Sequence, residues 1–162
     1  MTETTPSANP QPELKPAGQE SSRNAPERSS FEEAGHLCKL FISTLHQIEQ
    51  TPNVDLMASL FDDNAELWRQ SFREPYHGIP GVRRFWKEYL DQFEHVHSNF
   101  HRVVQRDKII ILEWLSEGAL LGGRPIHYAG VSILESGADD KIVSFRTYFD
   151  SAHFLTPQAL AH

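Results

Sequence analysis

The sequence is poor in the features that mark secreted and membrane proteins. It holds one cysteine, Cys38, so no disulfide can form within the chain, which fits a reducing compartment. No apolar run approaches the roughly 20 residues of a membrane span. The first residues also lack the basic start and apolar stretch of a secretory signal. We therefore predict a cytoplasmic protein with no membrane partner, in which Cys38 is a small buried residue rather than a reactive thiol.

Basic residues are also few. The 15 Lys and Arg residues are outnumbered by 22 Asp and Glu residues, which gives a net charge of -7. The one basic cluster, Arg83, Arg84 and Lys87, is diluted by Glu88 and Asp91 and is typical of the solvated face of a helix. Binding to a phosphate backbone needs a basic stripe, so we predict no nucleic-acid partner.

Motifs of phosphate and nucleophile chemistry are missing as well. The sequence has no Gly-rich phosphate loop, no nucleophile elbow and no pair of closely spaced cysteines. We predict no cofactor, so any function depends on the pocket that the fold creates.

Residues 1–30 contain no aromatic residue, and Leu14 is their only large apolar residue apart from Met1. Five of the ten prolines and eight serines or threonines lie there. Such a segment buries too little apolar surface to offset its ordering entropy. We predict a disordered tail over 1–30 and a single domain over 31–162, with a docking tail or a leader as the alternative for the first segment.

The first half of the domain has helical periodicity. Apolar residues recur with helical spacing over 31–49, a short helix follows the Thr-Pro-Asn sequence at 51–53, and Gly78 opens a third helix. Strand patterns follow, separated by short turns, which predicts an antiparallel sheet and an α+β layer arrangement. The predicted strands cover 65–72, 96–105, 109–117, 126–134 and 142–149.

Three segments carry a family resemblance: 78–86 (GIPGVRRFW), 112–118 (LEWLSEG) and 146–150 (RTYFD), which runs on to Phe154. Together with the order of elements, they resemble SnoaL-like domains of the nuclear transport factor two-like superfamily. The last segment is similar to the end of limonene epoxide hydrolases. The resemblance implies a cone-shaped roll, in which a curved antiparallel sheet is closed by the N-terminal helices and holds a small-molecule pocket. It also implies a homodimer formed through the outer face of the sheet.

Strand alternation, aligned by this resemblance, selects the pocket residues. It predicts an uncharged pocket with aromatic walls, suited to a flat apolar ligand that carries one or two oxygens. The predicted ligand-binding residues are Trp68, Gln70, Phe93, Trp114, Ser116, Thr147, Phe149 and Phe154.

The epoxide hydrolases activate water with an arginine and two aspartates. The resemblance places Trp114, Ser116 and Thr147 at these positions, and none of them carries a charge at pH 7. We therefore predict that epoxide hydrolysis by this route is absent.

Candidate catalytic residues are fewer. Tyr89 and Tyr128 are placed to donate to a developing oxyanion, or are core tyrosines with satisfied hydroxyls. The resemblance puts His95 near the pocket mouth, where it is the candidate general base. The alternatives are a metal site of His95, His97 and His101, which our prediction of no metal disfavours, and a polar outer strand face.

Three functions remain open from the sequence. The first is a cofactor-free cyclase, isomerase or dehydratase that acts on a small apolar carbonyl compound. The second is a non-catalytic domain that binds such a ligand, and the third is a dimerisation module. Since members of the superfamily catalyse different reactions, the site must decide between them.

Overall fold

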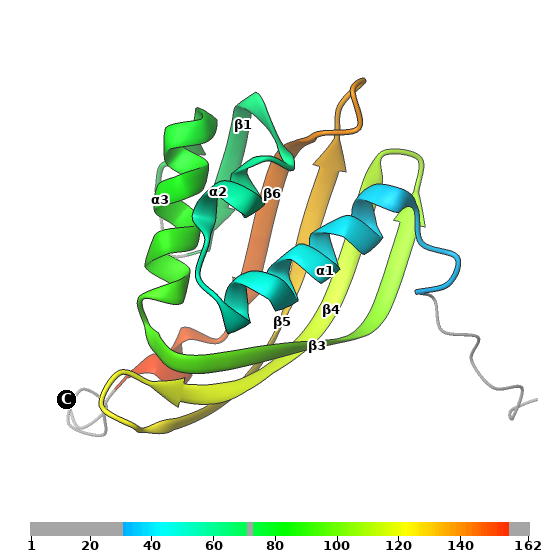
Figure 1. Ribbon diagram of the computed structural model, residues 1–162. Coiled ribbons are helices and arrows are strands. Elements are labelled where there is room, and N and C mark those ends of the chain that lie inside the picture. Colours follow the sequence, from blue (N-terminus) through cyan, green and yellow to red (C-terminus); the bar gives the residue numbers. More distant parts are fainter. Residues whose placement is uncertain (1–30, 71–72, 156–162) are drawn as a thin grey trace, which may run out of the picture.

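The computed structural model describes residues 31–70 and 73–155 as three helices and a six-stranded sheet (Figure 1). The predicted tail over 1–30 lies outside these residues. The helices are α1 (His36–Gln50), α2 (Val54–Ala58) and α3 (Gly78–Leu90), and a short 3-10 helix, η1, covers Ser151–Phe154. The strands are β1 (Phe61–Arg69), β2 (Tyr76–His77), β3 (Phe93–Arg106), β4 (Ile109–Leu120), β5 (Pro125–Ser136) and β6 (Ile142–Phe149).

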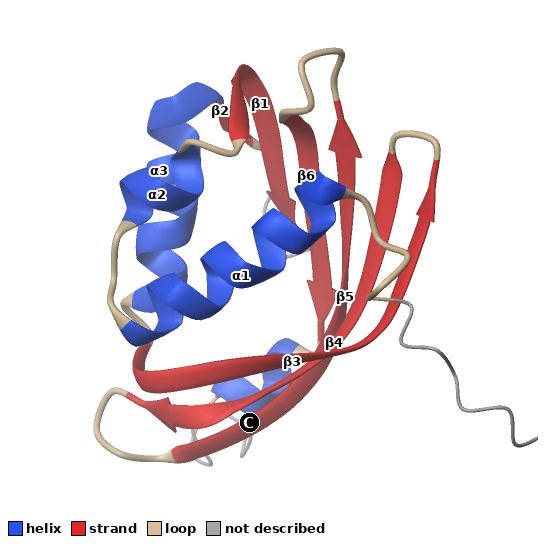
Figure 2. Cartoon of the chain, turned by 45° about the vertical axis from the view of Figure 1, so that its right-hand side comes forward, coloured by secondary structure: helices blue, strands red, loops and turns tan. Residues whose placement is uncertain are grey.

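The helices lie together on the concave face of the sheet, and α1 crosses that face (Figure 2). The α1 residues spaced at three or four positions, such as Phe41 and Leu45, are buried, as the periodicity predicts. Phe41 packs on Trp86 of α3 and Phe145 of β6, with ring centroids 6.0 and 5.7 Å away. These aromatic contacts fix both helices to the centre of the sheet and confirm the predicted α+β layers.

The sheet is mixed, whereas the sequence predicted an antiparallel one. Its strand order is β2-β1-β6-β5-β4-β3, and β1 runs parallel to β6. The strands from β3 to β6 are joined by short turns and pair antiparallel, as predicted. Because β1 and β6 are separated in the chain by α3 and four strands, turn length sets no constraint on their relative direction.

The start of β1 and the short strand β2 were not predicted. The Asp62-Asp63-Asn64 segment, predicted as a turn, lies within β1, where the register against β6 shifts between Phe61 and Glu66. This irregularity lets the polar triplet continue as a strand, since its side chains face outward at a bulge.

Two bulges in β3 bend the sheet around α1. The register against β4 shifts between Phe93 and His95 and again between Phe100 and Arg102. Gly118 lies opposite the first bulge, where a Cβ atom would come within 2.1 Å of the backbone oxygen of His95. Only glycine therefore tolerates this close approach of β3 to β4.

Within the described residues, no helix has both the length and the apolar character needed to cross a bilayer. Cys38 is buried in α1, and this burial raises the pKa of its thiol to about 11. Its predicted place as a small core residue is thereby confirmed.

Candidate functional site

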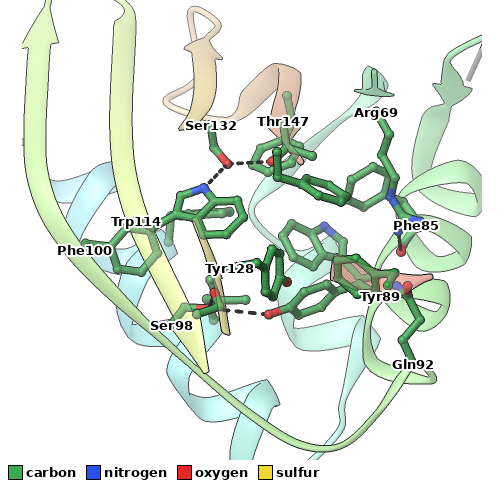
Figure 3. A pocket seen from close by; sticks show the side chains of 17 residues that line it. Arg69, Phe85, Tyr89, Gln92, Ser98, Phe100, Trp114, Tyr128, Ser132 and Thr147 are labelled. Atoms are coloured by element: carbon green, nitrogen blue, oxygen red, sulfur yellow. Dashed lines mark hydrogen bonds between the residues drawn. The ribbon is translucent and has the colours of Figure 1, made fainter. Parts of the chain in front are cut away.

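A pocket lies between the two longer helices and the concave face of the sheet (Figure 3). Its cavity volume is about 60 Å³. One water needs about 10–15 Å³ of such volume, so the cavity has room for a few waters or a small ligand. The lining residues are mainly aromatic: Phe41, Leu45, Arg69, Phe85, Trp86, Tyr89, Gln92, Ser98, Phe100, Trp114, Ser116, Tyr128, Ser132, Phe145, Thr147, Phe149 and Phe154.

Most of the predicted pocket residues are in place. The predicted faces of β4, β5 and β6 and the predicted closure by Phe154 all hold. Phe93 lies behind the wall, where its ring stacks on Tyr128 at 6.4 Å and meets Phe154 edge-on at 6.0 Å. The lining residues that the sequence predicted are Tyr89, Trp114, Ser116, Tyr128, Thr147, Phe149 and Phe154.

The predicted face of β1 is wrong. Trp68 and Gln70 lie on the outer side of the sheet, in a shallow groove with Tyr148, and Arg69 points into the pocket instead. Gln70 accepts a hydrogen bond from the backbone N–H of Phe149 at 3.1 Å. The error arose because the strand alternation was aligned by the family resemblance, and a shift of one residue reverses every side chain of a strand.

Arg69 also corrects the prediction of an uncharged pocket. Its side chain is 11% exposed, its guanidinium lies 4.2 Å from the centroid of the Phe85 ring, and it donates to the Phe85 carbonyl oxygen at 2.7 Å. Burial lowers the pKa of Arg69, while Tyr76 and Glu88 act in the opposite direction. The guanidinium lies 4.0 Å from the carboxylate of Glu88, so one end of the pocket carries a partly compensated positive charge.

His95 does not lie at the pocket. The bulge after Phe93 turns Val96 and Ser98 to the concave face and leaves His95, His97 and His101 on the exposed side of β3. The assignment of His95 as a general base at the pocket mouth, which the resemblance suggested, is therefore wrong, because the bulge leaves this residue on the outer side of the strand.

A buried carboxylate, which the sequence analysis missed, stands near the pocket instead. The side chain of Glu49 is 1% exposed, at the end of α1. Its Oε1 atom accepts from the Tyr89 hydroxyl at 2.8 Å and from the Ser98 hydroxyl at 2.6 Å. Ser98 in turn shares a hydrogen bond with Ser116 at 2.7 Å. We call Glu49, Tyr89, Ser98, Ser116 and Tyr128 the carboxylate chain; Tyr128 is included because Ser116, Glu49 and Tyr89 lie near enough to shift its pKa.

The backbone of Ser98 explains why Glu49 is held so firmly. Ser98 lies on the edge strand β3, where it donates its N–H to Glu49 Oε2 at 3.1 Å. Its carbonyl oxygen accepts from Nε2 of His46 at 2.7 Å. Two side chains of α1 thus take the place of a neighbouring strand. The sequence does contain one sign that Glu49 is buried. Glu49 follows Leu45 by four residues, so both lie on the buried face of the helix.

His46, Glu49 and His97 each bring one potential metal-ligand atom within 4.8 Å of the others. This grouping differs from the three histidines weighed from the sequence, because His46 of α1 and Glu49 replace His95 and His101. Because His46 donates from Nε2 to the Ser98 carbonyl oxygen and Glu49 accepts the Ser98 N–H, we assign these residues to a hydrogen-bonded cluster and not to a metal site.

Both pocket tyrosines remain protonated at neutral pH. Burial, followed by the neighbouring Tyr128 and Glu49, raises the pKa of Tyr89 well above 10.0. Burial is also the main cause that raises the pKa of Tyr128, while its hydrogen bond to Ser116 lowers it. Each phenol is therefore a neutral hydrogen-bond donor.

A second polar chain crosses the far wall of the pocket. The indole N–H of Trp114 donates to the Ser132 hydroxyl at 2.9 Å, and Ser132 donates to Thr147 Oγ1 at 3.1 Å. Figure 3 shows this neutral chain on the opposite side of the cavity from Tyr89 and Ser98. The described side chains of Trp114, Ser116 and Thr147, at the water-activating positions of epoxide hydrolases, make hydrogen bonds but carry no charge.

Solved structures show the same fold at low sequence identity. An NTF2-like protein from Anabaena variabilis ATCC 29413 superposes with a TM-score of 0.65 and 19% identity, over 72% of this chain and 89% of that one. A candidate SnoaL-like polyketide cyclase from Jannaschia sp. CCS1 superposes with a TM-score of 0.61 and 15% identity, over 76% of this chain and 98% of that one. An LEH-like epoxide hydrolase of M. tuberculosis superposes with a TM-score of 0.56 and 14% identity, over 70% of this chain and 83% of that one.

No protein with curated annotation matches the chain in sequence. The family profile of the SnoaL-like domain matches residues 43–145, which is more than half of the chain and includes the whole carboxylate chain and, from the neutral chain, Trp114 and Ser132. By its sequence as well as by its fold, this chain belongs to the SnoaL-like domain family.

Proposed function

We propose that the pocket catalyses a cofactor-free proton transfer on a small, mostly apolar carbonyl compound, as in a cyclisation, an isomerisation or a dehydration. One observation carries the proposal: a buried carboxylate, Glu49, accepts hydrogen bonds from the hydroxyls of two residues of the pocket wall, Tyr89 and Ser98. Glu49 takes the role that the sequence analysis gave to His95.

The proton has a continuous route from ligand to carboxylate. Glu49 is behind the wall, and the Tyr89 hydroxyl lies between its Oε1 atom and the cavity. When the C–H bond next to the ligand carbonyl breaks, its proton goes to the Tyr89 oxygen as the Tyr89 proton moves to Glu49. The electron pair of the C–H bond becomes an enolate. Positioned proton transfer of this kind contributes about 10² to 10⁴ in rate.

Tyr128 is the group that stabilises the developing enolate oxygen. Its hydroxyl belongs to the carboxylate chain, and its raised pKa keeps it protonated. A neutral donor in a site with little water stabilises an oxyanion more strongly than the same donor in bulk solvent. Proton acceptor and oxyanion donor therefore stand together on one side of the pocket.

The remaining walls favour a flat apolar body. The rings of Trp114, Phe149 and Phe154 surround Tyr128 at centroid distances of 5.3, 5.6 and 4.8 Å. Arg69 adds a positive charge, which attracts an oxygen substituent on the ligand. The candidate polyketide cyclase among the similar structures agrees with a carbonyl substrate, whereas the uncharged far wall disfavours epoxide hydrolysis.

The proposal is tested by deuterium exchange into small cyclic ketones. The full chain is incubated in D₂O with 2-indanone or 2-tetralone, and loss of the α-proton signals is followed by NMR. We expect the wild type to accelerate exchange and Glu49→Gln to lose at least about 100-fold of that acceleration. Glu135→Gln, which alters an exposed glutamate, is the matched control. Equal rates in the wild type and Glu49→Gln would contradict the proposal.

A second candidate function is non-catalytic binding of the same class of ligand. It is favoured by the aromatic lining and by the position of Glu49 behind the wall rather than on it. This function predicts that 2-tetralone binds the wild type and Glu49→Gln with equal affinity and that neither accelerates exchange.

We further propose that two copies associate through the outer face of the sheet. Four large apolar side chains are exposed there, Val104 (49%), Ile109 (38%), Ile111 (37%) and Tyr148 (45%). A contiguous apolar face of this kind is typical of an interface. Sedimentation should show a dimer that Ile111→Lys dissociates, while Leu121→Lys, at the exposed turn after β4, leaves it intact.

A further inference from the structure

We propose that His97 is the proton-exchange group of the pocket, which returns the proton of Glu49 to solvent after each turnover. This inference rests on the proposed function, because it assumes that Glu49 receives a proton. It assigns a role to a residue outside the cavity, on the far side of β3.

Glu49 is isolated from water on its pocket side. Its side chain is 1% exposed, and its Oε1 atom is occupied by Tyr89 and Ser98. A proton that is not returned to the ligand through Tyr89 must leave this carboxylate by another atom before the next turnover. Oε2, which accepts only from the Ser98 backbone among the described hydrogen bonds, is that atom.

His97 connects Oε2 to solvent. Its Nδ1 atom lies 3.9 Å from Glu49 Oε2, and its side chain is 52% exposed. Strand alternation explains this position, because Ser98 faces the pocket while its neighbour His97 faces out. A small ring rotation or one bridging water closes a gap of 3.9 Å. An imidazole suits the task, since it takes up a proton at one ring nitrogen and releases another from the second.

His46 holds the exchange group in place but does not exchange protons itself. Its ring stacks on His97, with centroids 5.0 Å apart and planes at 29°. Because a carbonyl oxygen only accepts, Nε2 of His46 carries the proton that it donates to Ser98. That N–H is fixed on the backbone, so His46 is a positioning residue.

The transfer is balanced without a co-reactant. The O–H bond of protonated Glu49 breaks as an N–H bond forms at Nδ1 of His97, either directly or through water. The resulting imidazolium loses its Nε2 proton to water or to a buffer base, and a ring flip or tautomer exchange restores the starting state. Glu49 is then a carboxylate again, ready to accept the next proton.

The experiment measures proton escape directly. Exchange of the Tyr89 hydroxyl proton with water is followed by NMR on the full chain at low buffer concentration. We expect His97→Gln to slow this exchange at least about tenfold, and His95→Gln, an exposed histidine on the same strand, to leave it unchanged. Adding imidazole buffer should restore the His97→Gln rate to near that of wild type, because a small base replaces the missing side chain.

The ketone assay separates the two proposals. If ketone exchange depends on Glu49 but neither exchange process responds to His97→Gln, the proposed function stands and this inference fails. A slowed variant that imidazole does not rescue also overturns the inference, because it indicates a structural role. If Tyr89 exchange depends on His97 while no ketone exchanges, the exchange route exists and the proposed function fails.

Discussion

The pocket contains two chains of hydrogen-bonded side chains, and they differ in where they end. The carboxylate chain leads from Tyr128 through Ser116 and Ser98 to the buried charge of Glu49. The neutral chain leads from Trp114 through Ser132 to Thr147 and contains no ionisable group. Both chains satisfy buried polar atoms, yet only the first can accept a proton.

This difference shows that similar hydrogen bonding on two walls of one pocket serves two purposes. The neutral chain fixes the Trp114 indole, whose N–H would otherwise be buried without a partner. The carboxylate chain fixes Tyr89 in the same way but also gives its proton a place to go. Predictions that treat the two chains alike would therefore fail.

The largest expected effect comes from removing one hydroxyl from each chain. Tyr89→Phe should lower the rate of ketone exchange at least about 100-fold, because it breaks the route to Glu49. Thr147→Val should change the rate less than about threefold and lower the free energy of unfolding by about 1 kcal/mol, through the lost hydrogen bond from Ser132. Comparable losses of rate in both variants would remove the functional distinction between the chains.

An intermediate effect is expected at Gly130, beside the neutral chain. A Cβ atom there would lie 2.5 Å from Cζ2 of Trp114 and 2.5 Å from the carbonyl oxygen of Tyr148. Gly130→Ala should lower the free energy of unfolding by about 1–3 kcal/mol, measured by urea denaturation, and should weaken 2-tetralone binding as the indole moves. Gly137→Ala, where a Cβ atom would lie 2.8 Å from Cγ1 of Val143 and 3.7 Å from the carbonyl oxygen of Lys141, is the comparison variant.

The smallest effect at neutral pH concerns the raised pKa of Tyr128. The pKa of Tyr128 is 10.0 in the unfolded chain and higher in the fold. At pH values between these two pKa values, the folded state binds more protons than the unfolded state. This contribution to stability is fully present below about pH 10 and is lost as the pH rises above it, by at most about 1.4 kcal/mol per pH unit for one phenol.

Tyr128→Phe removes this group, so its free energy of unfolding should fall less steeply above pH 10 than that of wild type. Urea denaturation at several alkaline pH values measures the slope, with Tyr148→Phe on the outer face as the control. Identical slopes for Tyr128→Phe and wild type would show that burial of Tyr128 does not oppose its ionisation.

Periodicity was enough to predict the helices, the hairpin strands and most of the pocket wall. The buried spacing of Phe41 and Leu45 places α1 on the sheet. Strict alternation correctly placed Trp114, Ser116 and Thr147 on the concave face. Local pattern suffices here because β5 pairs with β4, and with β6 from Ser144 to Phe149, without a shift in register.

Two features were beyond local pattern. The bulge in β3 leaves His95 on the outer side of the sheet, and it lies opposite Gly118 of another strand, where a Cβ atom would clash with the His95 backbone. The role of Glu49 depends on Ser98, which is 49 residues away in the chain. A charged residue near the end of a helix is normally solvated, so only the tertiary contact reveals its burial.

Arg69 illustrates the same limit. Its guanidinium faces inward because the Phe85 ring and carbonyl oxygen receive it, and neither contact is visible along β1 alone. Strand alternation, aligned by the family resemblance, placed Trp68 and Gln70 in the pocket instead. Long-range partners therefore decide which polar groups enter the pocket, whereas the apolar pattern decides that a pocket forms.

Infrared spectroscopy of Glu49 tests the central claim most directly. 2-Naphthol, a stable analogue of an enol, is added to the full chain at a pH where part of it is ionised, and the carboxylic-acid stretch is recorded for wild type and Glu49→Gln. The account predicts that binding produces a protonated-carboxyl band in wild type that is missing in Glu49→Gln, because Glu49 takes up the proton through Tyr89. An identical spectrum in both proteins, with the analogue bound, would contradict it.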